Sequence, residues 1–405
     1  MAITGPAVKT SPSHAPPLRA HAAARPPVNA WRRRFIARVV GATLLVQSGS
    51  LATFAWWMRP ALGAAGAALA SLALHALLSL IFVHRLVYWR DDVRAPWWRT
   101  WLIETPYTAF GSGAFLACAP SALIALGAWA MDVPAMPTIA ALHVAGWALG
   151  AWGSTAGRAF AVVTRREVRV RGLPRALDGL RVAQLSDVHC GPYVPRWMYR
   201  RWAARASGLG ADVIALTGDL ITAGEGYLDD VRDFVAHLRA PHGVVACMGN
   251  HDYFGTVFGV ADAVTAGGAR LLRNESFALA RDGAALWIAG IDDRWTKRDD
   301  LDAALRGVPE GAAVMLLAHD PASFPEAARR GVSLVLSGHT HGGQFGLPGW
   351  FERVNLARVI TRFTAGLFYV DESALYVNRG IGTTGPPVRV GMWPEVSLLT
   401  LRSAP

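Results

Sequence analysis

The sequence has little cysteine. Only three cysteines occur in 405 residues, Cys118, Cys190 and Cys247, and no two of them form a CxxC pair. An odd number of isolated cysteines argues against a disulfide framework and favours reduced thiols. We interpret Cys118 as a small apolar residue of an apolar run and Cys190 as a packed thiol.

Acidic residues are scarce in the first part of the chain. Residues 1–170 contain 16 Lys and Arg but only 5 Asp and Glu, whereas residues 171–405 contain 24 of each. The net charge of +11 therefore belongs entirely to the first part. A neutral C-terminal part argues against electrostatic capture of nucleic acid, which needs many cations to neutralise phosphates. We expect no nucleic-acid partner.

The chain begins with a stretch that lacks any periodicity. Residues 1–30 are rich in Ala and Pro, and residues 1–34 are predicted to be a disordered basic tail. The tail does not resemble a cleavable signal, because the apolar stretch starts only after the arginines at 32–34 and is long.

Four apolar runs, almost free of charge, follow within residues 35–165. They lie at about 39–57, 61–83, 107–131 and 138–163. Each approaches or exceeds the roughly 20 residues that cross a bilayer core. Buried helices of a large soluble domain are the alternative, but four successive runs favour membrane spans. The sequence predicts an all-α region with about four transmembrane helices.

Arginines predict the orientation of these spans. They precede the first span, lie between the second and third, and follow the fourth: Arg32, Arg33, Arg34, Arg38; Arg85, Arg90, Arg94, Arg99; Arg165, Arg166, Arg169. The opposite loops carry one arginine between them. Because basic loops favour the cytoplasm, we expect both termini to be cytoplasmic, in an inner (plasma) membrane protein. The segment 95–104, APWWRTWLIE, resembles an interfacial anchor.

Residues 171–405 differ in kind, since short β-rich runs alternate with polar, helical stretches. Runs at 213–216 and 332–336 are apolar without alternation, which is typical of strands covered on both faces. Segments 227–238 and 322–330 are predicted to be connecting helices. This pattern predicts an α/β domain of about 235 residues, which is long enough for a real core.

Polar side chains follow directly where five of these β-rich runs end. They are Asp187 and His189, then Asp219, then Asn250, His251 and Asp252, then His319, and finally His339 and His341. Open α/β sheets bind ligands beyond the carboxyl ends of their strands. Five loops that deliver Asp, Asn and His to one edge predict a metal site.

The ligand types indicate which metals fit. Two aspartates, one asparagine and four histidines form a mixed set that suits Mn, Fe, Co, Ni or Zn and suits Ca or Mg poorly. Seven ligands are too many for one tetrahedral ion and right for two ions that share a carboxylate. Two ions about 3.5–4 Å apart can hold a hydroxide and clamp both oxygens of a displacement at phosphorus. We expect two divalent ions, with Mn²⁺ as the first choice.

The ordered blocks D-x-H, G-D, G-N-H-D, H and G-H-x-H resemble the calcineurin-like metallophosphoesterase superfamily over residues 180–345. The resemblance implies a two-sheet β-sandwich flanked by helices, with two metals at its edge. It implies a first ion bound by Asp187, His189 and His341. It implies a second ion bound by Asn250, His319 and His339.

The resemblance also assigns the remaining motif residues. Asp219 would bridge the two ions. His251 would contact the phosphate and stabilise the transition state or protonate the leaving oxygen, while Asp252 would orient His251. The continuation GDLITAGEG departs from the Ser/Thr phosphoprotein phosphatase branch, which has an aspartate and an arginine there. Protein-phosphatase activity is therefore not expected.

The block at 376–387, YVNRGIGTTGPP, resembles a membrane-associated bacterial branch of the superfamily. That branch is tied to phosphodiester hydrolysis and, in some members, to the pyrophosphate of UDP-2,3-diacylglucosamine in lipid A synthesis. A Gly-rich loop after a strand lets backbone N–H groups approach an anion. Asn378 and Arg379 are predicted phosphate contacts, with a plain turn before the last strand as the alternative.

Three functions stay open from the sequence. The first is a membrane-anchored phosphoesterase that acts on a lipid-linked phosphodiester or pyrophosphate, with the bilayer as partner and the segment 347–368 as a rim for lipid headgroups or, alternatively, an ordinary helix and loop. The second is a tethered phosphodiesterase of soluble substrates. The third is an inert membrane scaffold or transport component, against which the complete ligand set argues. The oligomeric state is not predicted.

Overall fold

The computed structural model describes residues 30–88, 94–255, 257–350 and 353–404. Residues 1–29 of the tail predicted at 1–34 and the stretch 89–93 between the second and third predicted spans lie outside the described residues, whereas residues 30–34 belong to a helix and correct the predicted end of the tail. The side chains of residues 30–36 and 85–88 also lie outside the described part, and they include four of the eleven arginines that predict orientation: Arg32, Arg33, Arg34 and Arg85.

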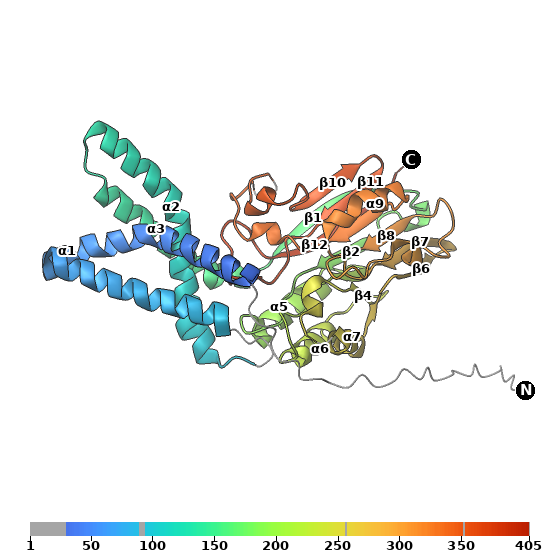
Figure 1. Ribbon diagram of the computed structural model, residues 1–405. Coiled ribbons are helices and arrows are strands. Elements are labelled where there is room, and N and C mark those ends of the chain that lie inside the picture. Colours follow the sequence, from blue (N-terminus) through green and yellow to red (C-terminus); the bar gives the residue numbers. More distant parts are fainter. Residues whose placement is uncertain (1–29, 89–93, 256, 351–352, 405) are drawn as a thin grey trace, which may run out of the picture.

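The first two predicted spans form one interrupted helix, α1 (Ala30–Tyr88). The helix breaks at Gly63, whose φ of 67° and ψ of 174° leave the helical region, three residues after Pro60. Glycine adopts this backbone without the steric cost that a Cβ brings. Figure 1 shows the two arms of α1 meeting at their far end, away from the strands. The apolar runs at 39–57 and 61–83 thus form a helical hairpin.

A second hairpin follows α1. A short π-helix, η1 (Arg99–Glu104), leads into α2 (Thr105–Met131), and α3 (Met136–Ser154) returns beside it. The two helices pack through glycines, since a Cβ on Gly113 or Gly146 would lie within 3 Å of backbone atoms of the other helix. Small residues allow this close approach of helices.

Two helical stretches among the described residues are long and apolar enough to cross a membrane, Ala37–His84 and Arg99–Met131. The first of them contains the break at Gly63. Two apolar candidates are therefore established by length and composition, and the finer prediction of four spans stays a prediction.

The C-terminal part is built on two six-stranded sheets, as the resemblance implies. In the first sheet the strand order is β1 (Val162–Arg171), β12 (Glu395–Ala404), β2 (Arg181–Leu185), β3 (Val213–Thr217), β4 (Val244–Cys247) and β5 (Ala269–Leu271). In the second sheet it is β10 (Gly366–Val370), β11 (Ser373–Val377), β9 (Leu334–Ser337), β8 (Val314–Leu317), β7 (Ala284–Gly290) and β6 (Glu275–Arg281).

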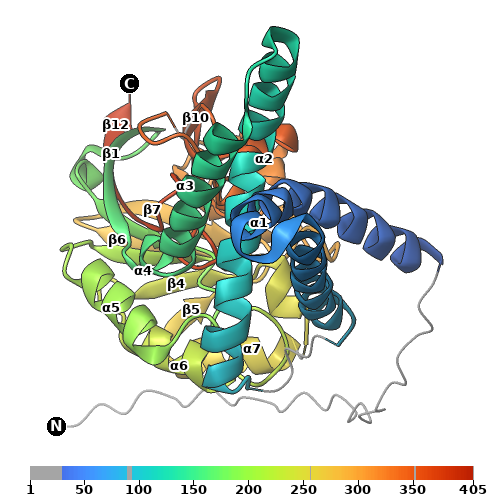
Figure 2. The ribbon, with the colours of Figure 1, turned by 90° about the vertical axis from the view of Figure 1, so that its left-hand side faces the viewer.

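The sheets pack face to face and helices cover their outer faces. Side chains such as Val213 and Met315 fill the space between the sheets. The outer face of the first sheet carries α5 (Arg196–Ser207), α6 (Leu228–Ala236) and α7 (Val257–Ala266), whereas the second carries α8 (Leu301–Ala304) and α9 (Phe324–Arg329). Figure 2 shows α5, α6 and α7 along one side of the sheets. The predicted sandwich flanked by helices is confirmed.

Strand direction places the predicted ligands at one edge. Strands β2, β3 and β4 run parallel in the first sheet, and β7, β8 and β9 run parallel in the second. The predicted runs at 213–216 and 332–336 correspond to β3 and β9. Each of β2, β3, β4, β8 and β9 ends directly before one of the polar motifs.

The helical region packs against the α/β domain through the junction of α3 and α4 (Ala156–Ala159). The Arg389 backbone N–H donates to the Gly153 carbonyl at 3.1 Å, and the Trp152 and Trp393 rings lie 4.9 Å apart. A Cβ on Gly157 would lie within 3 Å of the Arg389 carbonyl oxygen. The loop that carries Arg389 is thereby seated on the end of the helical region.

Candidate metal centre

The motif residues converge into three overlapping groups of possible metal ligands. These groups are Asp187, His189 and His341; His189, Asp219 and His251; and Asp219, His319 and His339. Within each group the ligand atoms lie within 4.8 Å of one another. Because the groups share His189 and Asp219, they form one continuous centre.

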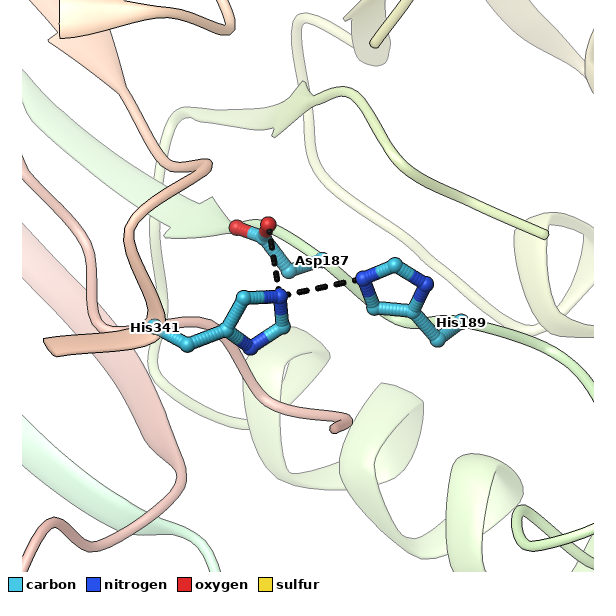
Figure 3. Close-up of side chains that lie close together, drawn as sticks. All are labelled: Asp187, His189 and His341. Atoms are coloured by element: carbon cyan, nitrogen blue, oxygen red, sulfur yellow. Dashed lines mark hydrogen bonds and ion pairs between the residues drawn. The ribbon is translucent and has the colours of Figure 1, made fainter. Parts of the chain in front are cut away.

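The first group has the donor arrangement of a cation site. His341 Nε2 lies 3.2 Å from Asp187 Oδ1 and 3.0 Å from His189 Nε2, and Figure 3 shows the three side chains pointing toward one another. Two imidazole nitrogens and a carboxylate that converge in a buried position need a positive charge between them. These residues therefore fit a divalent metal ion.

The second group lies across Asp219 from the first. His319 Nε2 is 3.2 Å from Asp219 Oδ2, and His339 Nδ1 is 3.3 Å from His319 Nε2 and 3.0 Å from Asn250 Oδ1. His319 Nδ1 lies 2.7 Å from the Thr217 carbonyl, to which it donates. That bond leaves the lone pair on Nε2, as a histidine ligand requires.

Asp219 lies between the two groups. Its Oδ2 is 3.6 Å from His189 Nε2 on one side and 3.2 Å from His319 Nε2 on the other. Burial alone raises the pKa of Asp219, but the neighbouring histidines outweigh burial and hold that pKa well below its usual range. The side chain is thus an anion with access to both groups.

The backbone is unusual at five of the seven predicted ligands. Asp187, His189, Asp219, His339 and His341 all have positive φ, between 49° and 70°. Residues other than glycine adopt this left-handed conformation rarely, and such residues cluster at functional sites.

The glycines of the motifs are required by close approach. A Cβ on Gly249 would collide with the Asp219 side chain and with its backbone nitrogen, which lies 2.5 Å away. A Cβ on Gly338 would overlap Ser186 and Asp187. These positions therefore exclude any residue with a side chain, because the ligand-bearing loops pass directly over them.

His251 borders the centre and is held from two sides. Its backbone N–H donates to Asp219 Oδ1 at 2.8 Å, its Nδ1 lies 2.7 Å from the Thr222 carbonyl, and its Nε2 lies 3.3 Å from Thr384 Oγ1. The Thr222 carbonyl fixes the proton on Nδ1, so that Nε2 is the atom that can exchange a proton at the centre.

The structure corrects the expectation that Asp252 orients His251. The Asp252 carboxylate accepts four backbone N–H groups instead, those of Gly249 and Asp219 at 2.9 Å, Leu220 at 2.8 Å and Ile221 at 3.2 Å. The orienting group of His251 is the Thr222 carbonyl. Asp252 holds the loop that carries Asp219 and is a positioning residue.

Replacement of Asp252 by alanine is expected to destabilise the domain. Four buried N–H donors lose their acceptor, and we expect the free energy of unfolding to fall by about 3 kcal/mol or more. Thermal unfolding in detergent measures the effect, with Asp262→Ala on the exposed side of α7 as the matched control. A variant of unchanged stability that loses only turnover would restore the orienting role.

Asn378 and Arg379 are not placed to contact a substrate, which corrects the second expectation. Asn378 Nδ2 donates to Ser397 Oγ at 2.7 Å, and Arg379 Nε donates to Glu395 at 2.9 Å and its Nη2 to Thr164 Oγ1 at 2.9 Å. Both side chains are buried. They join β11 to β1 and β12, and so they stabilise the sheets.

The buried pair of Glu395 and Arg379 predicts a contribution to acid stability. Burial alone raises the pKa of Glu395, but the Arg379 guanidinium outweighs it and the pKa falls to about 2. Because the folded pKa lies below the unfolded value of about 4.3, this contribution of about 3 kcal/mol is present above pH 4.3 and lost as the pH falls toward 2.

We therefore expect Glu395→Gln to lose less stability than the wild type between pH 7 and pH 3, although it is less stable at pH 7. Melting temperatures at the two pH values measure the difference. Glu372→Gln, which changes an exposed ion pair with Arg171, is the control. An equal loss in wild type and Glu395→Gln would contradict the assignment.

Two residues at the centre carry no signal in the motifs that predict the ligands. Thr384 belongs to the Gly-rich block, but nothing in that block sets it apart as a site residue. Its position beside His251 in the structure identifies it as one. Arg389 is buried, donates to the carbonyls of Arg379, Gly380 and Gly382, and lies 3.2 Å from His341 Nδ1. Burial lowers the pKa of Arg389 to about 9. Arg389 fixes the loop that closes over His341.

The two cysteines of the domain are packed thiols. Cys190 and Cys247 are buried and free, and burial raises the pKa of both well above the usual value. Among the described residues, Cys190 lies in none of the groups of possible metal ligands, although it follows His189.

Comparisons with known proteins agree with this centre. The family model of the calcineurin-like phosphoesterases matches residues 180–343. The metallophosphoesterase YkuE of Bacillus subtilis is 31% identical over 247 residues, which cover 59% of this chain and 85% of that protein. The transmembrane protein with metallophosphoesterase domain of Danio rerio is 33% identical over 252 residues, 59% of this chain and 56% of that protein.

A third relative carries a substrate in its name. The UDP-2,3-diacylglucosamine pyrophosphatase LpxG of Chlamydia trachomatis is 26% identical over 280 residues, which cover 55% of this chain and 84% of that protein. The similarity to all three proteins covers little more than half of this chain.

Proposed function

The chain belongs to the calcineurin-like metallophosphoesterases, which are metal-dependent phosphoric ester hydrolases, and we propose that it is membrane-anchored and hydrolyses a phosphodiester or pyrophosphate in a lipid-linked substrate. The observation that carries the reaction class is the convergence of Asp187, His189, Asp219, His319, His339 and His341 at one sheet edge.

The proposed allocation places Asp187, His189 and His341 on one ion and Asn250, His319 and His339 on the other. Asp219 would serve both. Two such ions supply Lewis acidity toward the phosphate oxygens and lower the pKa of water in the centre. Mn²⁺ is the proposed ion because the mixed nitrogen and oxygen donors suit it.

The residues of the chain supply proton transfer and position the substrate. His251 Nε2 faces the centre, while Nδ1 is committed to the Thr222 carbonyl. In this position His251 would donate a hydrogen bond to a phosphate oxygen and pass a proton to the leaving oxygen. The Thr384 hydroxyl, 3.3 Å from His251 Nε2, would keep that imidazole in place before the substrate arrives.

Membrane anchoring is supported by the two apolar helical stretches and by exposed aromatic residues. Most of the apolar surface of Ala37–His84 and Arg99–Met131 is not buried within the protein. Trp97 and Trp98, in the predicted interfacial anchor, are exposed, and tryptophan favours the headgroup layer. We propose four spans in the inner membrane, with both termini and the catalytic domain in the cytoplasm.

A lipid-linked substrate is supported by the apolar surface beside the centre. In the segment 347–368, the side chains of Val359 and Ile360 are 83% and 90% exposed. Water-exposed aliphatic residues in the segment that comes after the metal motif are suited to contact with lipid. UDP-2,3-diacylglucosamine, the substrate in the name of the chlamydial relative, is the proposed first candidate.

Substrate preference tests the proposal. In detergent with Mn²⁺, we expect the full chain to cleave UDP-2,3-diacylglucosamine with a kcat/KM about tenfold or more above that of bis-p-nitrophenyl phosphate, because remote binding energy is available only from the lipid. A marked preference for the soluble ester would favour a tethered phosphodiesterase of soluble substrates. Bound metal without any hydrolysis would favour an inert scaffold or transport component.

A further inference from the structure

An apolar groove lies between the N-terminal helices and the α/β domain. Its volume is about 650 Å³; Val39, Val46 and Phe82 of α1 and Phe115 of α2 line one side, and Phe345 and Pro386 line the other. We propose that this helix–domain groove holds one hydrocarbon chain of the substrate while the substrate's phosphate lies at the metal centre. The inference rests on the proposed function and names the part of the chain that selects the lipid.

The domain side of the groove is made by the loops that border the metal centre. Phe345 follows Gln344, whose side chain accepts from the Thr384 N–H at 2.9 Å and donates to the Pro386 carbonyl at 3.0 Å. Thr384 in turn lies 3.3 Å from His251 Nε2. Gly385 and Pro386 line the groove, so the residue directly after Thr384 already borders it.

Among the described residues, the helix side of the groove offers few free polar groups, and Gln47 Oε1, which is buried without a hydrogen-bond partner, is one of them. The Thr43 hydroxyl donates to the Val39 carbonyl at 2.8 Å, and the Gln47 amide donates to the Tyr107 hydroxyl at 3.4 Å. The remaining side chains are predominantly aliphatic or aromatic. An apolar wall of this kind stabilises a bound hydrocarbon chain and offers few hydrogen bonds to a hydrophilic phosphoester.

The occupant is a lipid chain and not a peptide segment. A peptide would bring many backbone N–H and C=O groups, and the walls hold too few polar groups to pair with them. The two helices that line the groove are also the stretches able to cross a membrane. A hydrocarbon chain can therefore move from the bilayer into the groove along α1 and α2 without entering water.

The test compares two p-nitrophenyl phosphodiesters, one ethyl and one dodecyl, which share the same leaving group. In mixed micelles with Mn²⁺, we expect full-length wild type to prefer the dodecyl ester by about tenfold or more in kcat/KM, because each buried methylene adds affinity. Gly111→Trp should bring this ratio close to one. A Cβ on Gly111, which lines the groove, meets nothing within 4 Å, so the indole fills the groove.

Gly127→Trp is the matched control, since Gly127 lies on the same helix, meets equally open space and does not line the groove. The ratio of kcat/KM for the dodecyl and ethyl esters should be the same in Gly127→Trp as in wild type. Because both variants meet the same micelles, this comparison also controls for partitioning of the dodecyl ester into micelles. Metal content and melting temperature of both variants report folding. The same fall in both variants, or no chain-length preference in wild type, would overturn the groove assignment while phosphoester hydrolysis stands.

A second measurement needs no variant. A hexadecyl phosphate that carries a diazirine in its chain should label residues 39–47 or 107–115 of wild type upon illumination, as read by mass spectrometry. Labelling elsewhere alone would overturn the assignment, and labelling here without chain-length preference would indicate a structural lipid. Hydrolysis of neither ester by metal-loaded wild type would overturn the proposed function itself, and the groove assignment with it.

Discussion

Replacement of Asp219 by alanine should remove both bound metal and activity. The Asp219 carboxylate approaches ligand atoms of both groups, at 3.6 Å from His189 Nε2 and 3.2 Å from His319 Nε2. Without the Asp219 carboxylate, the centre has less negative charge, and we expect the remaining histidines not to hold a second cation. Metal ions contribute several kcal/mol to phosphoryl chemistry, so we expect kcat/KM to fall by about 10³-fold or more.

Metal analysis beside phosphodiesterase assays checks this result. Wild type should carry two ions per chain and Asp219→Ala one or none. Asp229→Ala, which removes only an exposed pair with Arg232, should keep both ions and full activity. Two retained ions in Asp219→Ala would mean that the two groups bind independently, and the bridging role would be wrong.

His251→Ala should separate catalysis from metal binding. The His251 imidazole is held by the Thr222 carbonyl and faces Thr384, outside the sets proposed to bind the two ions. We expect two retained ions and a fall in kcat of about 10²- to 10⁴-fold, the usual contribution of a general acid.

The leaving group sharpens this result. A substrate whose leaving oxygen needs no proton, such as a p-nitrophenyl ester, should lose less activity in His251→Ala than one with an alkoxide leaving group. His242→Ala, at an exposed histidine away from the centre, is the control. Loss of metal in His251→Ala would instead make His251 a ligand, which its closeness to His189 and Asp219 allows.

The convergence of the proposed ligands could be predicted from sequence because each of them lies within a few residues of a strand end. In β3 and β9, continuous apolar residues mark the strand, and the first polar residues after it mark the edge. Parallel pairing then brings these ends together whatever the helices between them do. The break of α1 at Gly63 falls near the start of the second apolar run, although no motif predicts the conformation of Gly63.

The wrong predictions concern residues whose partners lie far along the chain. Arg379 follows a strand in a Gly-rich block, as a phosphate ligand would. Its guanidinium is instead paired with Glu395 on β12. Asp252 is adjacent to His251 in sequence, yet the 3-10 turn Asn250–Tyr253 directs its carboxylate to the loop after β3. Neighbours in the chain are poor guides to side-chain partners where the backbone turns sharply.

The seating of the Arg389 loop on the end of α3 and α4 bears on how such an enzyme can evolve. The Gly153 carbonyl and the Gly157 surface support the backbone of a residue that touches His341. A gene fusion that exchanged the helical region for another one would also exchange this support. The helical region and the α/β domain therefore depend on each other at this contact, and a substitution at Gly153 or Gly157 would displace the Arg389 loop.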